Sequence, residues 1–201
     1  MVAALGVRGT AALLALLAGA CASVPVAPPA ARARARAVEV YSARLRVSLR
    51  GPELRARTAL LVGFVRPDAL RLELPGPTGA RLIAVARDGR LTAVFPAERA
   101  VLQDVASSTT LRHLLGVELE PRDIMDLLTG SVPPRLRACS ITWGAVLPRK
   151  LDLTLPDGAH LALTVEDPQV EVALPAHAFD EPPHAGFREV SAEEARRLWA
   201  R

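Results

Sequence analysis

The residues that could carry out catalysis are few, and the most suggestive pair is Asp123 and Asp126. Paired carboxylates can share general acid and base roles, and their spacing of three residues places both on one face of a predicted helix. Such a pair is ordinarily a solvated charged face, so we expect no catalysis from it. The sequence also lacks a serine in a Gly-x-Ser-x-Gly turn and a glycine-rich phosphate loop. We therefore predict that the protein is not an enzyme and uses no cofactor.

Metal binding is not predicted either, because the histidines are scattered. His113 falls in a predicted helix and His160 in a predicted strand, while His177 and His184 lie in a proline-rich tail. A metal site built from the last two would lack further ligands close by in the chain. All four are expected to be ordinary exposed or half-buried side chains. Cys139, in an apolar strand-like stretch, is expected to behave as a small buried hydrophobe.

The other cysteine, Cys21, stands where a covalent modification is predicted. It follows a segment with one positive charge, Arg8, and an apolar run over residues 11–18 that is too short to span a bilayer. The run continues into small residues and the cysteine, Leu-Ala-Gly-Ala-Cys over residues 17–21, which resembles the lipobox of bacterial lipoproteins. We predict that residues 1–20 are a signal peptide and that acylated Cys21 anchors the chain to a membrane.

The residues that follow this cysteine predict the membrane to which the chain is targeted and a tether. Ala22 stands where an aspartate would resemble an inner-membrane retention signal, so we expect the periplasmic face of a Gram-negative outer membrane. Residues 21–37 combine prolines with alternating alanine and arginine and cannot bury much surface, which predicts an extended or fluctuating tether. Its arginines are expected either to be solvated or to touch anionic lipid headgroups. They are Arg32, Arg34 and Arg36.

The composition places the remainder of the chain in one globular domain. The chain has 201 residues, of which 50% are hydrophobic and 3% aromatic, and its formal net charge is +4. So few aromatic side chains argue against nucleic-acid binding by base stacking. The modest positive charge is expected to be a solvated surface or a patch for an anionic partner.

A period of two residues dominates the chain from Val38 onward. Between Tyr41 and Arg50, apolar residues alternate with serine and arginine, which predicts a strand with one apolar and one charged face. Similar runs separated by turn residues predict about ten strands in all. Besides the first strand, they cover residues 54–64, 70–74, 82–86, 91–95, 100–105, 136–143, 151–155, 160–165 and 170–174.

The period changes to three and four residues in two places, which predicts two short helices. They cover 111–116 and 124–130, and each ends at a glycine, which is the usual helix terminator. The tail after Pro175 is proline-rich and predicted to be irregular. Near its end, Ser191 begins a capping box that predicts a short helix ending near Trp199.

These elements predict a mainly β fold, an unclosed and strongly curved antiparallel β-barrel with short helices covering or plugging its mouth. The barrel is expected over residues 38–175, and the tail over 176–201. Either the helices fill the interior, or they leave a hydrophobic groove for lipid chains. The residues expected to line that space are Leu45, Val47, Leu60, Val62, Leu72, Leu82, Leu114 and Leu127.

Several short segments occur in an order that, together with the lipobox, is similar to one superfamily. They are Arg66-Pro67-Asp68 followed by Leu70-Arg71-Leu72-Glu73, then Pro75 to Gly79, Asp88-Gly89, Leu114-Leu115-Gly116 and Leu127 to Pro133. Over about residues 41–133 the chain resembles the LolA/LolB superfamily of bacterial lipoprotein carriers, and most closely its LolB-like outer-membrane branch.

This resemblance implies an unclosed barrel whose interior receives the acyl chains of lipoproteins, which a periplasmic LolA-like carrier would deliver. It also implies that one loop, Pro75-Gly76-Pro77-Thr78-Gly79, faces the membrane. The LolB-like pattern has a bulky apolar residue before the glycine of this loop. Here the residue is Thr78, and threonine inserts into lipid far less favourably than leucine.

We therefore expect an outer-membrane lipoprotein that binds acyl chains and takes part in lipoprotein localisation or insertion. The alternative is a structural or scaffolding envelope lipoprotein, with a filled barrel and an arginine-bearing face that binds a protein partner. An enzyme that modifies lipids or the envelope is the least supported hypothesis, because no nucleophile and base can be paired.

Overall fold

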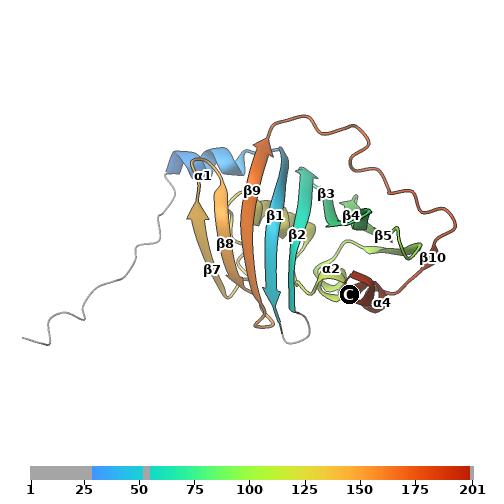
Figure 1. Cartoon of the computed structure of the whole chain (residues 1–201). Coiled ribbons are helices and arrows are strands. Elements are labelled where there is room, and N and C mark those ends of the chain that lie inside the picture. The colour runs from blue at the N-terminus through green and yellow to red at the C-terminus, as the bar shows by residue number, and fades with distance from the viewer. Residues whose placement is uncertain (1–28, 52–54, 200–201) are drawn as a thin grey trace, which may run out of the picture.

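The protein folds around one ten-stranded sheet in the computed structural model, which describes residues 29–51 and 55–199 (Figure 1). The strand order is β10-β6-β5-β4-β3-β2-β1-β9-β8-β7, and neighbours are antiparallel except for β10 and β6. Because β7 and β10 are the two edges of the sheet and do not pair with each other, the barrel is unclosed, as predicted. Cys21 and the predicted signal segment lie outside the described residues.

The strands are β1 (Val40–Arg50), β2 (Arg55–Val65), β3 (Ala69–Gly76), β4 (Gly79–Arg87), β5 (Arg90–Phe95), β6 (Ala100–Val105), β7 (Ala138–Trp143), β8 (Pro148–Thr154), β9 (His160–Val170) and β10 (Arg188–Glu189). The helices are α1 (Pro29–Arg36), α2 (Ser108–Leu115), α3 (Pro121–Leu128) and α4 (Ala192–Trp199).

The alternation of β1 shows how the sheet acquires two different faces. Tyr41, Leu45 and Leu49 are buried on the inner face, whereas Arg46 and Arg50 are exposed on the outer face. Successive side chains of a strand point to opposite faces, so this pattern orients the whole sheet with its apolar face inward. The inner faces of the other strands and the α2–α3 segment complete one continuous core.

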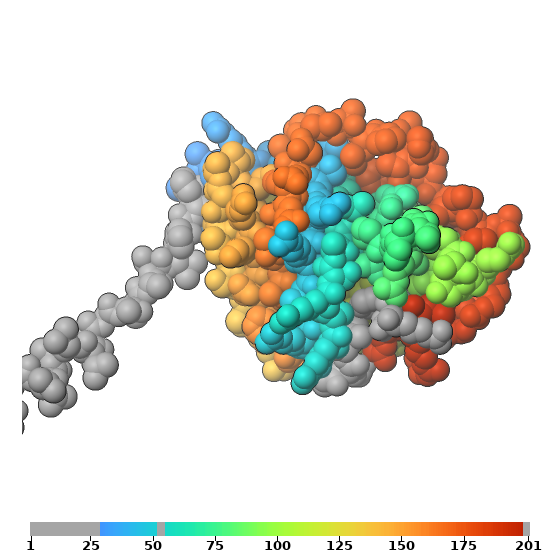
Figure 2. Space-filling view, in the orientation of Figure 1, coloured from blue at the N-terminus to red at the C-terminus, as the bar shows by residue number. Residues whose placement is uncertain are grey.

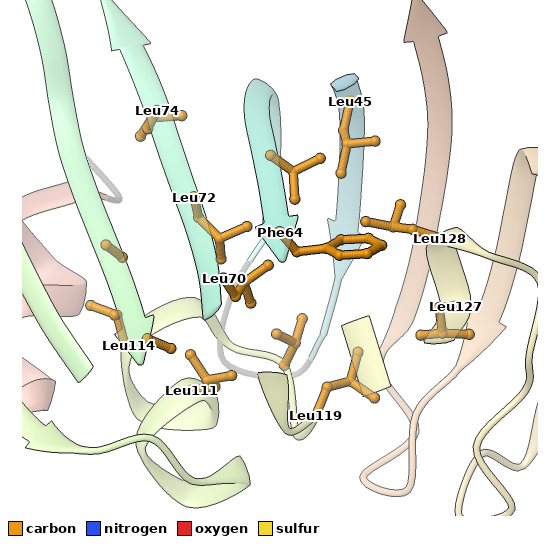
Figure 3. Packing of buried hydrophobic residues seen from close by; sticks show 14 of the residues in the cluster. Leu45, Phe64, Leu70, Leu72, Leu74, Leu111, Leu114, Leu119, Leu127 and Leu128 are labelled. Atoms are coloured by element: carbon orange, nitrogen blue, oxygen red, sulfur yellow. The ribbon is translucent and has the colours of Figure 1, made fainter. Parts of the chain in front are cut away.

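Helices α2 and α3 lie on the inner side of the sheet and begin and end at residues suited to those places. The Ser107 side chain accepts a hydrogen bond from the Thr110 amide at the start of α2, and Gly116 ends that helix in the left-handed conformation. Pro121 opens the first turn of α3. Figure 3 shows leucines of both helices and of the link between them facing leucines of the sheet.

Helix α1 corrects the expectation of an extended or fluctuating tether, which is wrong for residues 29–36. Alanine and arginine are both strong helix formers. Alanines four residues apart lie on the same face of a helix, so this segment carries a stripe of alanine. Ala31 and Ala35 form that stripe, and Ala35 is fully buried in the main core. Arg32, Arg34 and Arg36, which were predicted to lie on a tether, therefore lie on a folded helix.

The C-terminal third differs from the prediction in two places. Strand β9 continues through residue 170, and the predicted strand 170–174 does not form; Glu171, just after β9, adopts a positive φ of 55°. The tail, expected to be irregular up to its last helix, crosses the outer face of the sheet and forms β10 in parallel with β6. Phe179 of this segment is buried against Ala69 and Val85. The predicted last helix is confirmed as α4.

Candidate functional site

An apolar cavity of about 100 Å³ lies between the sheet and the α2–α3 segment. Its lining comes from one half of the sheet and from the helices that cover it, and Thr58 supplies the one hydroxyl group. The lining residues are Leu45, Val47, Leu49, Ala56, Thr58, Leu60, Leu72, Leu74, Leu82, Leu115, Val117, Leu119, Ile124, Leu127, Leu128, Leu161 and Leu163. A space walled in this way can hold hydrocarbon and offers no charged group to a polar ligand.

Most of the residues predicted to line the interior are brought together at this cavity. Leu45, Val47, Leu60, Leu72, Leu82 and Leu127 border it. Val62 and Leu114 do not border it and are packed in the surrounding core instead. Val62 stands one inward step beyond Leu60 on β2, between Ala43 and Leu72 in the register.

Other parts of the wall were not anticipated as cavity residues. The link between α2 and α3 contributes Val117 and Leu119, and β9 contributes Leu161 and Leu163. The alternation over residues 160–165 could have indicated the β9 pair, because β9 is the neighbour of β1. Nothing in the periodicity of the link marks its two residues, since it belongs to neither a helix nor a strand.

The size of the cavity shows how far the helices fill the interior of the barrel. A cavity of roughly 150 Å³ suffices for one benzene ring, and typical ligand pockets span about 300–1,000 Å³. The cavity of about 100 Å³ is smaller than either, so the helices occupy most of the interior in this conformation. Space for an entire acyl chain requires α2 and α3 to move away from the sheet.

The cavity reaches the surface at one end of the sheet. Its strand residues belong to the later halves of β1 and β3 and the earlier halves of β2, β4 and β9, which an antiparallel order places at the same end. There Val47, Thr58 and Leu163 are half-buried rather than buried. The β1–β2 and β3–β4 hairpins surround this opening, so the loop of residues 75–79 lies beside it.

Polar contacts hold α3 over the cavity at its C-terminal end. Arg66, just after β2, forms an ion pair with Asp126 of α3 at 2.9 Å. Its guanidinium also donates hydrogen bonds to the Thr129 hydroxyl and the Val38 carbonyl, both at 3.1 Å. The same group lies over the Phe64 ring, 5.6 Å from the ring centroid. One arginine therefore joins the sheet, the end of α3 and the segment before β1.

A second contact holds the other end of α3. Arg135 forms an ion pair with Asp123 in the first turn, and the Asp123 carboxylate also accepts a hydrogen bond from the Glu120 amide. The two aspartates considered for catalysis, Asp123 and Asp126, thus each bind an arginine. Their arrangement positions α3 and provides no free acid–base pair.

The candidate metal ligands and Cys139 all lie in the part of the chain that the structure describes. Within it, no group of three or more His, Cys, Asp and Glu side chains is placed to hold a metal ion. Burial and the nearby Asp152 carboxylate raise the pKa of the Cys139 thiol, which keeps it protonated and weakly nucleophilic. No helix among residues 29–51 and 55–199 is long and apolar enough to cross a membrane.

Comparisons with known proteins find likeness in structure but not in sequence. No protein-family model and no curated protein sequence matches the chain. Similar solved structures include a DUF1329 family protein from Desulfovibrio piger, with a TM-score of 0.46, 10% identity and coverage of 78% of this chain and 95% of that one. An uncharacterized conserved protein from Thermus thermophilus has a TM-score of 0.44 and 10% identity, covering 79% and 94%.

A third similar structure comes from Vibrio parahaemolyticus and is described as an outer membrane lipoprotein-sorting protein domain. Its TM-score is 0.41 at 10% identity, and the alignment covers 75% of this chain and 93% of that one. Because the identities and TM-scores are this low, what this chain binds is inferred from its own cavity.

Proposed function

We propose that the protein is an acyl-chain-binding lipoprotein of the LolA/LolB type, with no covalent chemistry of its own. The observation that carries this proposal is the apolar cavity under α2 and α3, which opens at one end of an unclosed barrel. Removing one CH₂ group from water contributes about 0.8 kcal/mol, so even a partly enclosed chain is held firmly. Such binding depends on area and still permits transfer to a more apolar acceptor.

In this proposal, acyl binding and opening of the helical cover are one event. The chain enters from the hairpin end and displaces α3 from the sheet, because the closed cavity of about 100 Å³ is too small for it. Apolar contacts between α3 and the sheet are replaced by contacts with the ligand. The free energy of binding is therefore reduced by the cost of opening.

The cellular setting belongs to the same proposal. Acylated Cys21 anchors the protein to the periplasmic face of the outer membrane, and a LolA-like periplasmic carrier supplies lipoproteins. The loop Pro75-Gly76-Pro77-Thr78-Gly79 faces the membrane. Its exposed residues, Pro75, Pro77, Thr78 and Gly79, lie beside the cavity opening, which supports that role.

The test uses two adjacent leucines on opposite faces of β2. Leu60 borders the cavity and Leu61 lies on the outer face, and both are half-buried. The full chain carrying Cys21→Ser is mixed with a palmitoylated peptide, and complexes are counted by native mass spectrometry. We expect a one-to-one complex that Leu60→Gln weakens about tenfold or more, since a leucine contact contributes about 1.5–3 kcal/mol.

Leu61→Gln is the matched control and should leave the complex unchanged. The absence of a complex with the folded chain, or equal weakening by both substitutions, would contradict acyl binding in this cavity.

One observation favours a second candidate, a scaffolding lipoprotein with a filled barrel. The cavity is smaller than ordinary ligand pockets, so a rigid α2–α3 cover would leave no space for lipid. That candidate predicts no acylated-peptide complex and no lipid that copurifies with the folded chain.

A further inference from the structure

Three arginines gather at the end of the β1–β2 hairpin, on the outer face of the sheet. Arg50 of β1 is directly opposite Arg55 of β2, and Arg57 is opposite Ser48, one outward step away. On its other side, Arg50 is paired in register with His160 of β9. Arg50, Arg55 and Arg57 are all exposed. We call these three residues the arginine cluster.

Among the residues that the structure describes, the arginine cluster has no carboxylate partner. Elsewhere on the outer face, Arg46 is bound by Glu166 at 2.7 Å and Arg71 by Glu73 at 3.1 Å. Within residues 29–51 and 55–199, by contrast, no carboxylate forms an ion pair with a member of the cluster. The segment 50–57 contains one glutamate in its sequence, which still leaves a net charge of +2.

Placing like charges opposite each other in a sheet is unfavourable for folding. The cross-strand neighbours of Arg50 are an arginine and a histidine, where an acidic residue would have stabilised the hairpin. Such an arrangement gains stability when an external anion binds between the guanidinium groups. Guanidinium groups bind phosphate oxygens in a bidentate manner, which makes them well suited to phosphate groups.

The arginine cluster lies beside the opening of the apolar cavity. A hollow of about 540 Å³ at the hairpin end is bordered by the cluster together with Leu49 and Ala56. Leu49 and Ala56 also border the apolar cavity, so the two spaces meet across the hairpin. Figure 2 shows the ends of β1 and β2 at the lower edge of the molecule.

We propose that this end of the molecule docks onto a bilayer surface containing anionic phospholipids, with the arginine cluster bound to headgroup phosphates. Docking in this orientation turns the cavity opening toward the bilayer. The occupant is inferred from charge complementarity and from the apolar opening next to the cluster. The proposal does not require an acyl chain to enter the cavity, so it can fail or succeed independently of the proposed function.

The test measures binding of the full chain to vesicles. Cys21→Ser is present in all samples to remove the predicted acylation site. Sedimentation compares vesicles of phosphatidylcholine alone with vesicles that also contain phosphatidylglycerol. The ratio of the two affinities isolates the electrostatic contribution from any hydrophobic binding common to both.

We expect R50Q/R55Q/R57Q to reduce the preference for phosphatidylglycerol about a hundredfold, at roughly fivefold for each arginine. The preference of the unsubstituted cluster should also fall steeply as salt is raised. The matched control is R90Q/R149Q/K150Q, which removes three exposed positive charges toward the opposite end of the strands. This control should retain most of the preference, although its net charge is the same.

Two results would overturn the proposal. Equal losses of preference in both triple variants would show that only net charge matters. An undiminished preference in the cluster variant would show that these arginines bind another partner, such as an acidic protein. Thermal unfolding checks that R50Q/R55Q/R57Q is folded, and we expect no loss of stability because opposed positive charges are removed. R50K/R55K/R57K provides a second check, since it keeps the charge and should keep most of the preference.

Discussion

Tyr41 both stabilises and destabilises the core that contains it. Its ring stacks on Phe64 with centroids 5.0 Å apart and an interplanar angle of 10°, and the residue is fully buried. Within the described residues its hydroxyl has no hydrogen-bond partner, and burial raises the pKa of the phenol. A buried hydroxyl without a partner costs about 1–3 kcal/mol, so the ring stabilises the core while its oxygen opposes it.

Tyr41→Phe is therefore expected to raise the free energy of unfolding by about 1 kcal/mol at neutral pH, measured by urea denaturation. The pH dependence has a definite sign. Because the folded state has the higher pKa, the free energy of unfolding does not depend on this group below about pH 10 and falls as the pH rises further, when only the unfolded state loses the phenolic proton. Tyr41 is the only tyrosine, so phenolate absorbance reports it alone and should appear only with unfolding. A less stable Tyr41→Phe variant would show that the hydroxyl is satisfied.

At the scale of elements, helix α3 is the part whose attachment bears most directly on function. It covers the cavity with Ile124, Leu127 and Leu128, while Arg66 and Arg135 hold its two ends. These contacts stabilise α3 in its closed position, and few polar contacts have to break for α3 to move away from the sheet. Small changes at the arginines should therefore alter how often the cavity opens.

We expect Arg66→Gln to lower the free energy of unfolding by about 1–3 kcal/mol, because hydrogen bonds to a charged group are lost. Hydrogen exchange should quicken first in residues 121–128. The matched control is Arg71→Gln, whose arginine contacts Glu73 and the Ala178 carbonyl and not α3. Faster exchange spread evenly over the sheet, or no change in α3, would show that Arg66 does not hold the cover closed.

At the scale of the whole molecule, α1 limits how far the fold can move from the predicted anchor. Only eight peptide steps separate Cys21 from Pro29, and these span at most about 28 Å. Strand β1, with 11 residues, is about 36 Å long. An anchored molecule therefore stays close to the bilayer, and its hairpin end reaches the surface when the sheet is inclined.

Cys21→Ala tests the anchor in the intact cell envelope. The variant should lose palmitate labelling and move from the membrane to the soluble fraction, with its thermal unfolding unchanged. Any membrane association that remains should be removed by raised salt, as expected for the arginine cluster alone. Firm, salt-resistant membrane binding of the variant would contradict the anchoring role of Cys21.

Much of the fold could be predicted because the pattern of residues acts locally. Alternation from Tyr41 to Arg50 fixes which side of β1 faces the core, and the leucine spacing before Gly116 indicates a helix. Five of the predicted lining residues border the cavity for the same reason, since inward positions on neighbouring strands must meet, and Leu127 reaches it from α3. Helix α1 was missed because the prolines before it and the arginines within it suggested a tether, while its buried alanine stripe depends on a surface elsewhere in the chain.

The sequence by itself determined strands β1 to β9, their inward faces, the covering helices and the predicted acylation site, because each depends on residues close together in the chain. Only the tertiary structure decided the size of the cavity, the contacts of Arg66 with α3 and the parallel pairing of β10. It also decided that Arg50 stands between Arg55 and His160. These features join residues distant in sequence, and their geometry is set by sheet register and curvature, which local periodicity does not encode.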